Sequence, residues 1–162
     1  GIGSTQTVPQ RQIERVARRL ERATPSQLRI VVTHQPVAVT RPQEETNLLH
    51  GREAAVRSWA NAGADLILGG HIHLPYVLAL RERFAGLRRE VWAVQAGTAV
   101  SWRVRHDAGN SVNLLRYAGV LRHHRCVAVE LWEYSESQQC FLPATINELN
   151  FTASDDVGQF PI

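Results

Sequence analysis

The sequence lacks several residue types entirely or almost entirely. Its 162 residues include no lysine, no methionine and only two cysteines, Cys126 and Cys140. Neither cysteine belongs to a C-x-x-C pair, which argues against a zinc finger or a disulfide framework. No apolar run reaches the length of about 18 residues that a membrane-spanning helix requires, and no signal-peptide pattern is present. We therefore expect a cytoplasmic protein that makes no contact with a membrane.

The charge is low and evenly spread. All 18 basic residues are arginine, and they exceed the 15 acidic residues by three. A nucleic-acid-binding surface is usually more densely basic, so we consider nucleic acid an unlikely partner. The length and the 44% hydrophobic content are typical of one globular domain. We expect that domain over residues 1–150, followed by a loose tail over residues 151–162.

The first half of the sequence predicts alternating helices and strands. Apolar residues recur at three- and four-residue steps in two segments, which indicates helices over residues 7–23 and 48–62. Short runs rich in β-branched and aliphatic residues at 28–33 and 65–68 indicate buried strands. The polar segment 35–47 is predicted to be a loop. This order is typical of an α/β fold with a parallel sheet.

The second half predicts strands without helices between them. The predicted strands cover residues 76–80, 91–96, 112–117, 125–134 and 139–142. The fold class expected from the whole sequence is therefore α/β, with a parallel first part and a β-rich second part.

Three histidines follow predicted strands. His34 ends the first buried strand, whereas His71 and His73 follow the second one after two glycines. Ligands gather at the carboxyl ends of parallel strands, so His34 and His71 should meet if these strands are neighbours. On extended backbone, His71 and His73 would project from the same side. A single histidine of this kind is more often structural, but three together indicate a metal site.

These motifs resemble those of a known enzyme family. The stretch from Ile30 to Pro36, with its strand-His-x-Pro pattern, and the stretch from Ala64 to His73, with its Gly-His-x-His ending, are similar to the last two metal motifs of calcineurin-like metallophosphoesterases. The resemblance covers roughly residues 28–113. It implies that His34 and His71 bind one metal ion and His73 another, within a centre of two Mn, Fe or Zn ions. It also implies an αββα sandwich, of which this chain would form half.

The earlier motifs of that family are missing. The sequence contains no D-x-H, G-D-x-x-D or G-N-H motif, and its four aspartates stand in no such pattern. The family's general-acid histidine would lie in the missing part, so no catalytic residue is assigned. Because the chain begins at Gly1 and contains no methionine, we expect it to be a processed or truncated carboxyl-terminal half.

Two functions remain open at this point. In the first, the complete protein hydrolyses phosphomonoesters or phosphodiesters, this chain alone is inactive, and Arg103 and Arg105 offer guanidinium groups to the phosphate. In the second, the chain is a non-catalytic binding or interaction module, as a degenerate relative or a partner subunit. Either function predicts association with a missing amino-terminal half or with a second copy, because half of a sandwich exposes sheet edges.

Overall fold

The computed structural model describes residues 7–102, 104–121 and 124–152. Two helices, α1 (Gln10–Leu20) and α2 (Arg52–Asn61), form one layer of the molecule. Each helix buries its apolar stripe, and Trp59 of α2 joins the two by donating from Nε1 to the carbonyl oxygen of Ile13 at 3.2 Å. Both predicted helices are therefore present, although each starts three or four residues later than predicted.

The first sheet has four strands in the order β1-β2-β4-β3. Its strands are β1 (Ile30–Val32), β2 (Leu66–Gly69), β3 (Tyr76–Ala79) and β4 (Trp92–Gln95). β1, β2 and β4 run parallel, and β3 is antiparallel to β4. This sheet confirms the predicted parallel α/β part.

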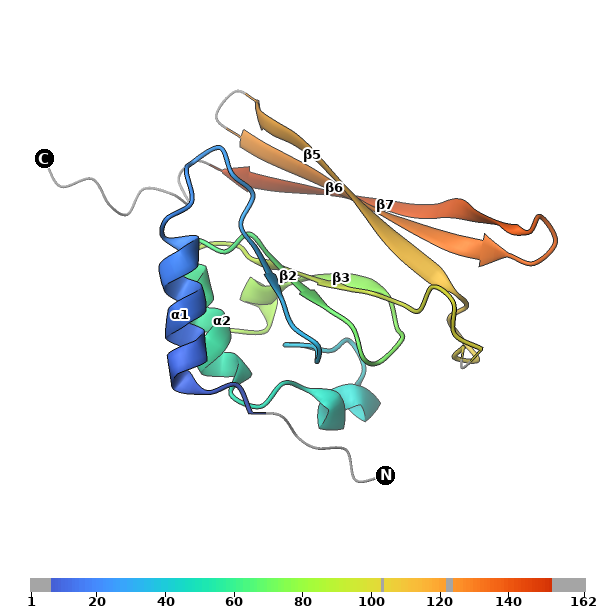
Figure 1. Cartoon of the computed structure of the whole chain (residues 1–162), viewed down its shortest axis with the longest axis horizontal. Helices are drawn as coiled ribbons and strands as arrows, with labels where there is room; N and C mark the ends of the chain where they lie inside the picture. The colour runs from blue at the N-terminus through green and yellow to red at the C-terminus, as the bar shows by residue number, and fades with distance from the viewer. Residues whose placement is uncertain (1–6, 103, 122–123, 153–162) are drawn as a thin grey trace, which may run out of the picture.

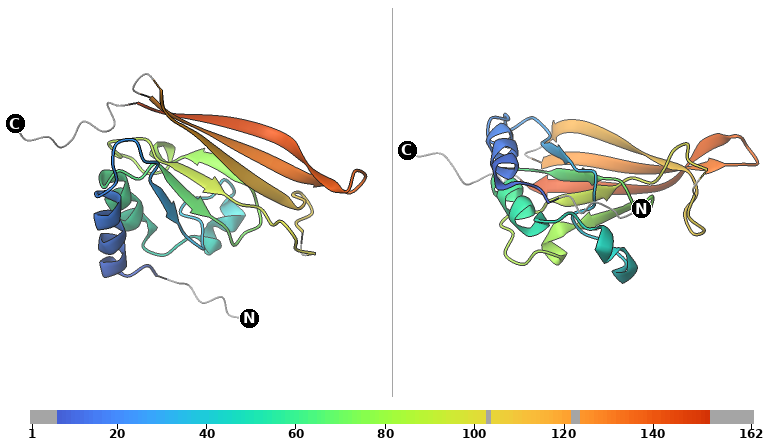
Figure 2. Two further views of the ribbon diagram at one scale, coloured as in Figure 1. Left: turned by 45° about the horizontal axis from the view of Figure 1, so that its top comes forward. Right: turned by 60° about the horizontal axis from the view of Figure 1, so that its bottom comes forward.

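The second sheet is an antiparallel meander of long strands. It contains β5 (Ser111–Leu121), β6 (His124–Ser135) and β7 (Cys140–Thr152), with β6 in the centre. Figure 1 shows this sheet lying over the first one and extending beyond it, while α1 and α2 cover the opposite face. The order of layers is thus helices, first sheet, second sheet, as the two further views in Figure 2 also show. The predicted β-rich second part is confirmed.

Two apolar cores hold the three layers together. The first lies between the helices and the first sheet and includes Val31, Val56 and Ile67. The second lies between the two sheets and includes Leu66, Val127 and Phe151. Adjacent residues of β2 therefore point into different cores, because successive side chains of a strand project to opposite faces.

Several sequence predictions need correction. The strand at 28–33 is buried on one face only: Val31 lies in the first core, but β1 is at the edge of its sheet and Val32 is 75% exposed. The predicted loop at 35–47 contains a 3-10 helix, η1 (Pro42–Asn47), and a second one, η2 (Leu80–Glu82), follows β3. Phe151 and Thr152, which the sequence analysis assigned to a tail, belong to β7; residues 153–162 lie outside the described residues. Within the described ranges, no helix has the length and apolar character needed to cross a bilayer.

Candidate functional site

The site lies where β1 and β2 end side by side. The parallel register pairs Val32 with Leu68, so the segments that follow the two strands emerge at the same edge of the sheet. Backbone hydrogen bonds continue beyond the strands, and the amide of Gly70 donates to the carbonyl oxygen of His34 at 3.1 Å. This pairing holds the His34 segment against the segment that carries His71.

The imidazoles of His34 and His71 meet at this edge. Nδ1 of His71 lies 3.0 Å from Nε2 of His34, which is a hydrogen-bond distance. The ring centroids are 4.8 Å apart and the rings are inclined at 66°, an edge-to-face arrangement. Both side chains are exposed to solvent. The predicted convergence of these two histidines is confirmed; their binding of a metal stays a prediction.

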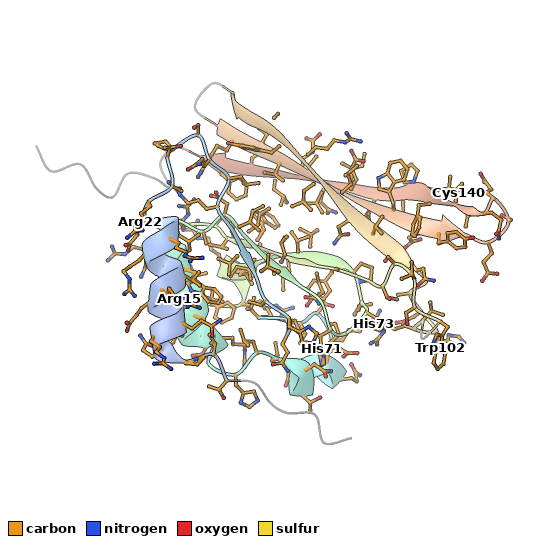
Figure 3. All side chains as sticks on the ribbon, in the orientation of Figure 1. Arg15, Arg22, His71, His73, Trp102 and Cys140 are labelled. Atoms are coloured by element: carbon orange, nitrogen blue, oxygen red, sulfur yellow. The ribbon has the colours of Figure 1, made fainter. Side chains whose placement is uncertain are left out.

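The segment that carries His71 and His73 is a turn and not extended backbone. His71 and His73 both adopt positive φ angles, 73° and 55°, in the left-handed region. Ile72 and Leu74, which alternate with them, are buried. The expectation of an extended Gly-His-x-His segment was therefore wrong: the backbone amide of Ile72 donates to the carbonyl oxygen of Gly70 at 2.9 Å and closes a tight turn around His71. Figure 3 shows where His71 and His73 lie relative to the loop that carries Trp102.

Gln95, the last residue of β4, holds this turn in place through a hydrogen bond. Its side-chain amide, which is almost fully buried, donates from Nε2 to the carbonyl oxygen of Gly70. Asn113 of β5 donates in turn from Nδ2 to the carbonyl oxygen of Gln95 at 3.0 Å. A side chain at Gly69 would force Gln95 to move, since a Cβ would overlap with its Oε1. Sequence reasoning gave Gln95 no role; the available signal was a polar residue ending an apolar strand.

Arg105 binds the neighbouring loop to the site. Its Nη1 donates to the carbonyl oxygen of Ile72 at 3.1 Å, and its Nη2 lies 2.8 Å from Oε1 of Glu44. Its Nε lies 3.4 Å from Oδ1 of Asp107. These contacts use all three guanidinium nitrogens, and the hydrogen bond to Glu44 is the largest cause of a raised Arg105 pKa. Substrate binding by Arg105 stays a prediction, and Arg103 lies outside the described residues.

The opposite end of β2 carries a buried ionic cluster. Asp65, which is fully buried, lies 2.7 Å from Nη2 of Arg89 and 3.0 Å from Nη2 of Arg125 through Oδ1. Its Oδ2 accepts hydrogen bonds from the backbone amide of Arg29 at 2.8 Å and from Nη1 of Arg125 at 3.2 Å. Burial raises the pKa of the Asp65 carboxyl, while the amide and the guanidinium groups act against that rise. Because Arg125 belongs to β6, this cluster joins the two sheets.

The residues at the histidine site do not form a donor set for two metal ions. Two imidazole nitrogens 3.0 Å apart provide two of the four ligands that Zn²⁺ usually takes. In the described part of the chain, no three His, Cys, Asp or Glu side chains form a group that could hold a metal ion. The carboxylates of Glu44 and Asp107, which Arg105 connects to this turn, form ion pairs with that arginine. A dinuclear centre does not fit the described residues alone.

Comparisons with known proteins give only a weak structural likeness. Neither a protein-family model nor a curated protein sequence matches the chain. Among solved structures, Vps29 from Chaetomium thermophilum is similar, with a TM-score of 0.40 and 14% sequence identity. The match covers 81% of this chain and 59% of Vps29. The chain thus spans less than two thirds of the length of that structure.

Proposed function

We propose that this chain is a non-catalytic binding module that acts by associating with another polypeptide. The observation that carries the proposal is the contact between His34 and His71, which brings two imidazoles together without a carboxylate in the same group. Such a pair can donate and accept hydrogen bonds at an exposed sheet edge, as a recognition site requires. Its donor set is too small, and too weakly charged, for the work of two cations.

The positions of the described aspartates support this proposal. Hydrolysis by two metal ions needs cations about 4 Å apart, held and charge-balanced by carboxylates. Asp65 lies at the far end of β2 and is paired with Arg89 and Arg125. Asp107 forms ion pairs with Arg41 and Arg105, and the hydrogen bond from Arg41 is the largest cause of its lowered pKa. Neither carboxylate is available to the two imidazoles.

A second candidate is the hydrolysis of phosphomonoesters or phosphodiesters by a complete protein. The meeting of His34 and His71 at two strand ends favours it, since ligands gather at such ends. In that case His34, His71 and His73 would supply imidazole ligands to Mn, Fe or Zn ions, and another segment would supply the carboxylates.

A turnover assay separates the two candidates. Two proteins are purified: the chain itself, and a longer form expressed with an upstream segment of its reading frame. Each is incubated with a generic aryl phosphodiester and Mn²⁺, Fe²⁺ or Zn²⁺. We expect no hydrolysis above that of the metal in buffer in either form, because the module does no chemistry. Hydrolysis by the extended protein that is lost in His71→Ala would contradict the proposal and establish the second candidate.

The control variant is His50→Gln. His50 is exposed, and its only described hydrogen bond is made by its backbone carbonyl, which accepts from Val8 at 3.1 Å. Any turnover that His50→Gln loses to the same extent as His71→Ala would be assigned to a contaminant or to nonspecific binding of metal. Far-ultraviolet circular dichroism of each variant confirms that the fold is retained.

A further inference from the structure

The outer edge of β1 is open. Among the described residues, β1 is the terminal strand of its sheet and pairs with β2 alone. The amide of Thr33 and the carbonyl of Arg29 both bond toward β2, to Leu68 and to Leu66 respectively. Because successive residues of a strand present their backbone groups to opposite sides, those of Ile30 and Val32 point toward the open edge. A further strand could pair with them.

A groove follows this open edge. It has a volume of about 740 Å³ and is walled on one side by Val16 and Leu20 of α1. Ile30 and Val32 form its apolar floor, and Tyr117 of β5 lies on the other side. The hydroxyl of Tyr117 donates to the carbonyl oxygen of Ser26 at 2.6 Å, which fixes that wall. The groove therefore runs between the helix layer and the second sheet, where one more strand would continue the first sheet.

The helix beside the groove is positively charged. Residues 11–22 contain five arginines and two glutamates, which gives this segment a net charge of +3. All five arginines are exposed: Arg11, Arg15, Arg18, Arg19 and Arg22. Arg19 lines the groove itself, whereas Arg11, Arg15 and Arg18 line a different hollow beside α1. Figure 3 shows Arg15 on α1 and Arg22 just beyond the end of that helix.

We propose that this groove binds an extended, apolar polypeptide segment flanked by acidic residues, which adds to β1 as a new edge strand. The inference rests on the proposed function, because it specifies the chemistry of the associating polypeptide. Backbone hydrogen bonds to Ile30 and Val32 would supply affinity, as in other cases of strand addition. Acidic residues at the ends of the segment would meet the arginines of α1.

The positive charge of α1 favours this occupant over a second copy of the chain. Two copies paired antiparallel through β1 would place both α1 helices on the same face of the joined sheet. Their arginines would then approach each other, and like charges facing across an interface oppose association. An acidic-ended segment meets the same helix with opposite charge. The two walls of the groove also favour apolar side chains on both faces of the segment, as in a buried strand.

The test uses a synthetic peptide with a centre rich in valine and isoleucine and with glutamates at both ends. Fluorescence anisotropy of the labelled peptide measures its binding to the whole chain. We expect saturable binding that weakens as salt is raised, and weaker binding of a peptide with lysines in place of the glutamates. Hydrogen exchange should show the amides of Ile30 and Val32 becoming protected when the peptide is added.

Val32→Pro removes an outward-pointing donor without touching the bonds to β2, and proline is tolerated on edge strands. We expect it to weaken peptide binding by about two- to tenfold, which is the effect of losing one hydrogen bond. Arg19→Glu should also weaken binding and reduce its dependence on salt. The matched control is Arg83→Glu, an exposed arginine after η2, which should leave binding unchanged.

Three results would overturn the inference: no saturable binding, equal binding by Val32→Pro without protection of the β1 amides, or a dimer of the chain alone that Val32→Pro dissociates. The last result would assign the groove to a second copy. Failure of the proposed function is distinguishable, since phosphodiester turnover would overturn the module and leave the peptide result standing. If the peptide does not bind and no phosphodiester turnover is measured, only the inference about the groove is overturned.

Discussion

The two ends of β2 are built in opposite ways. At its amino end, the Asp65 carboxylate is fully buried and accepts contacts from Arg89, Arg125 and the Arg29 backbone. At its carboxyl end, His71 is exposed, adopts a positive φ angle and contacts only another exposed imidazole among its described side-chain partners. One end is closed and paired across both sheets, whereas the other is open to solvent.

This difference separates the residues that hold the fold from those that can bind. A buried ion pair is expensive to break, so Asp65 fixes how the second sheet sits on the first. The left-handed backbone at His71 costs folding energy and is retained only where the surrounding structure imposes it. Together with the supporting amide of Gln95, that cost is the reason for proposing the carboxyl end as the binding site.

The largest effect is expected at the closed end. Asp65→Asn would leave the guanidinium groups of Arg89 and Arg125 buried without their counter-charge, and we expect a loss of about 3–5 kcal/mol in the free energy of unfolding. Urea denaturation measures it. The control is Asp107→Asn, an exposed partner of Arg41, which should change little. Equal stability of the two variants would remove the structural role assigned to Asp65.

A smaller effect is expected at Gly69, the last residue of β2. Gly69→Ala would push a methyl group into Oε1 of Gln95 and displace the amide that binds the Gly70 carbonyl. We expect a loss of about 1–3 kcal/mol, the range for an overpacked interior. Gly70→Ala is the matched control, because its Cβ would lie 3.8 Å from the nearest atom, the carbonyl oxygen of His34. The account of the turn fails if Gly70→Ala destabilises the chain as much.

The smallest effect is expected at the open end, with the opposite sign. His71→Gly relieves the positive φ angle, so the free energy of unfolding should rise by about 0.5–1 kcal/mol. His34→Gly removes the same contact between rings, but His34 has no positive φ angle and should gain nothing. Thermal denaturation of both variants at one pH makes the comparison. A loss in both variants would mean that the ring contact itself stabilises the fold, whereas an equal gain in His34→Gly would mean that the positive φ angle is not the cause of the gain.

Local patterns in the sequence predicted much of this structure. Apolar periodicity placed both helices, and runs of β-branched residues placed β1 and β2 in a parallel sheet. From that topology alone, His34 and His71 were expected to meet, and Nδ1 of His71 lies 3.0 Å from Nε2 of His34. The argument succeeded because the carboxyl ends of adjacent parallel strands must emerge at the same edge.

The remaining features depend on contacts between distant segments. The apolar run of β1 suggested a buried strand, but a run of this kind does not reveal whether a neighbour covers it, and Val32 is exposed. The cluster at Asp65 joins residues as far apart as 29 and 125, which no local pattern connects. Likewise, the turn at His71 is held by Gln95 of β4, whose side-chain amide donates to the carbonyl oxygen of Gly70.

The most direct test of the account is a titration of the purified chain with Zn²⁺, followed by nitrogen-15 NMR of its imidazoles. The central claim is that His34 and His71 form an exposed pair that lacks the further ligands of a dinuclear centre. We therefore expect their resonances to shift together, in fast exchange, with one ion per chain. Two ions bound in slow exchange, with the resonances of His73 shifting as well, would contradict the account.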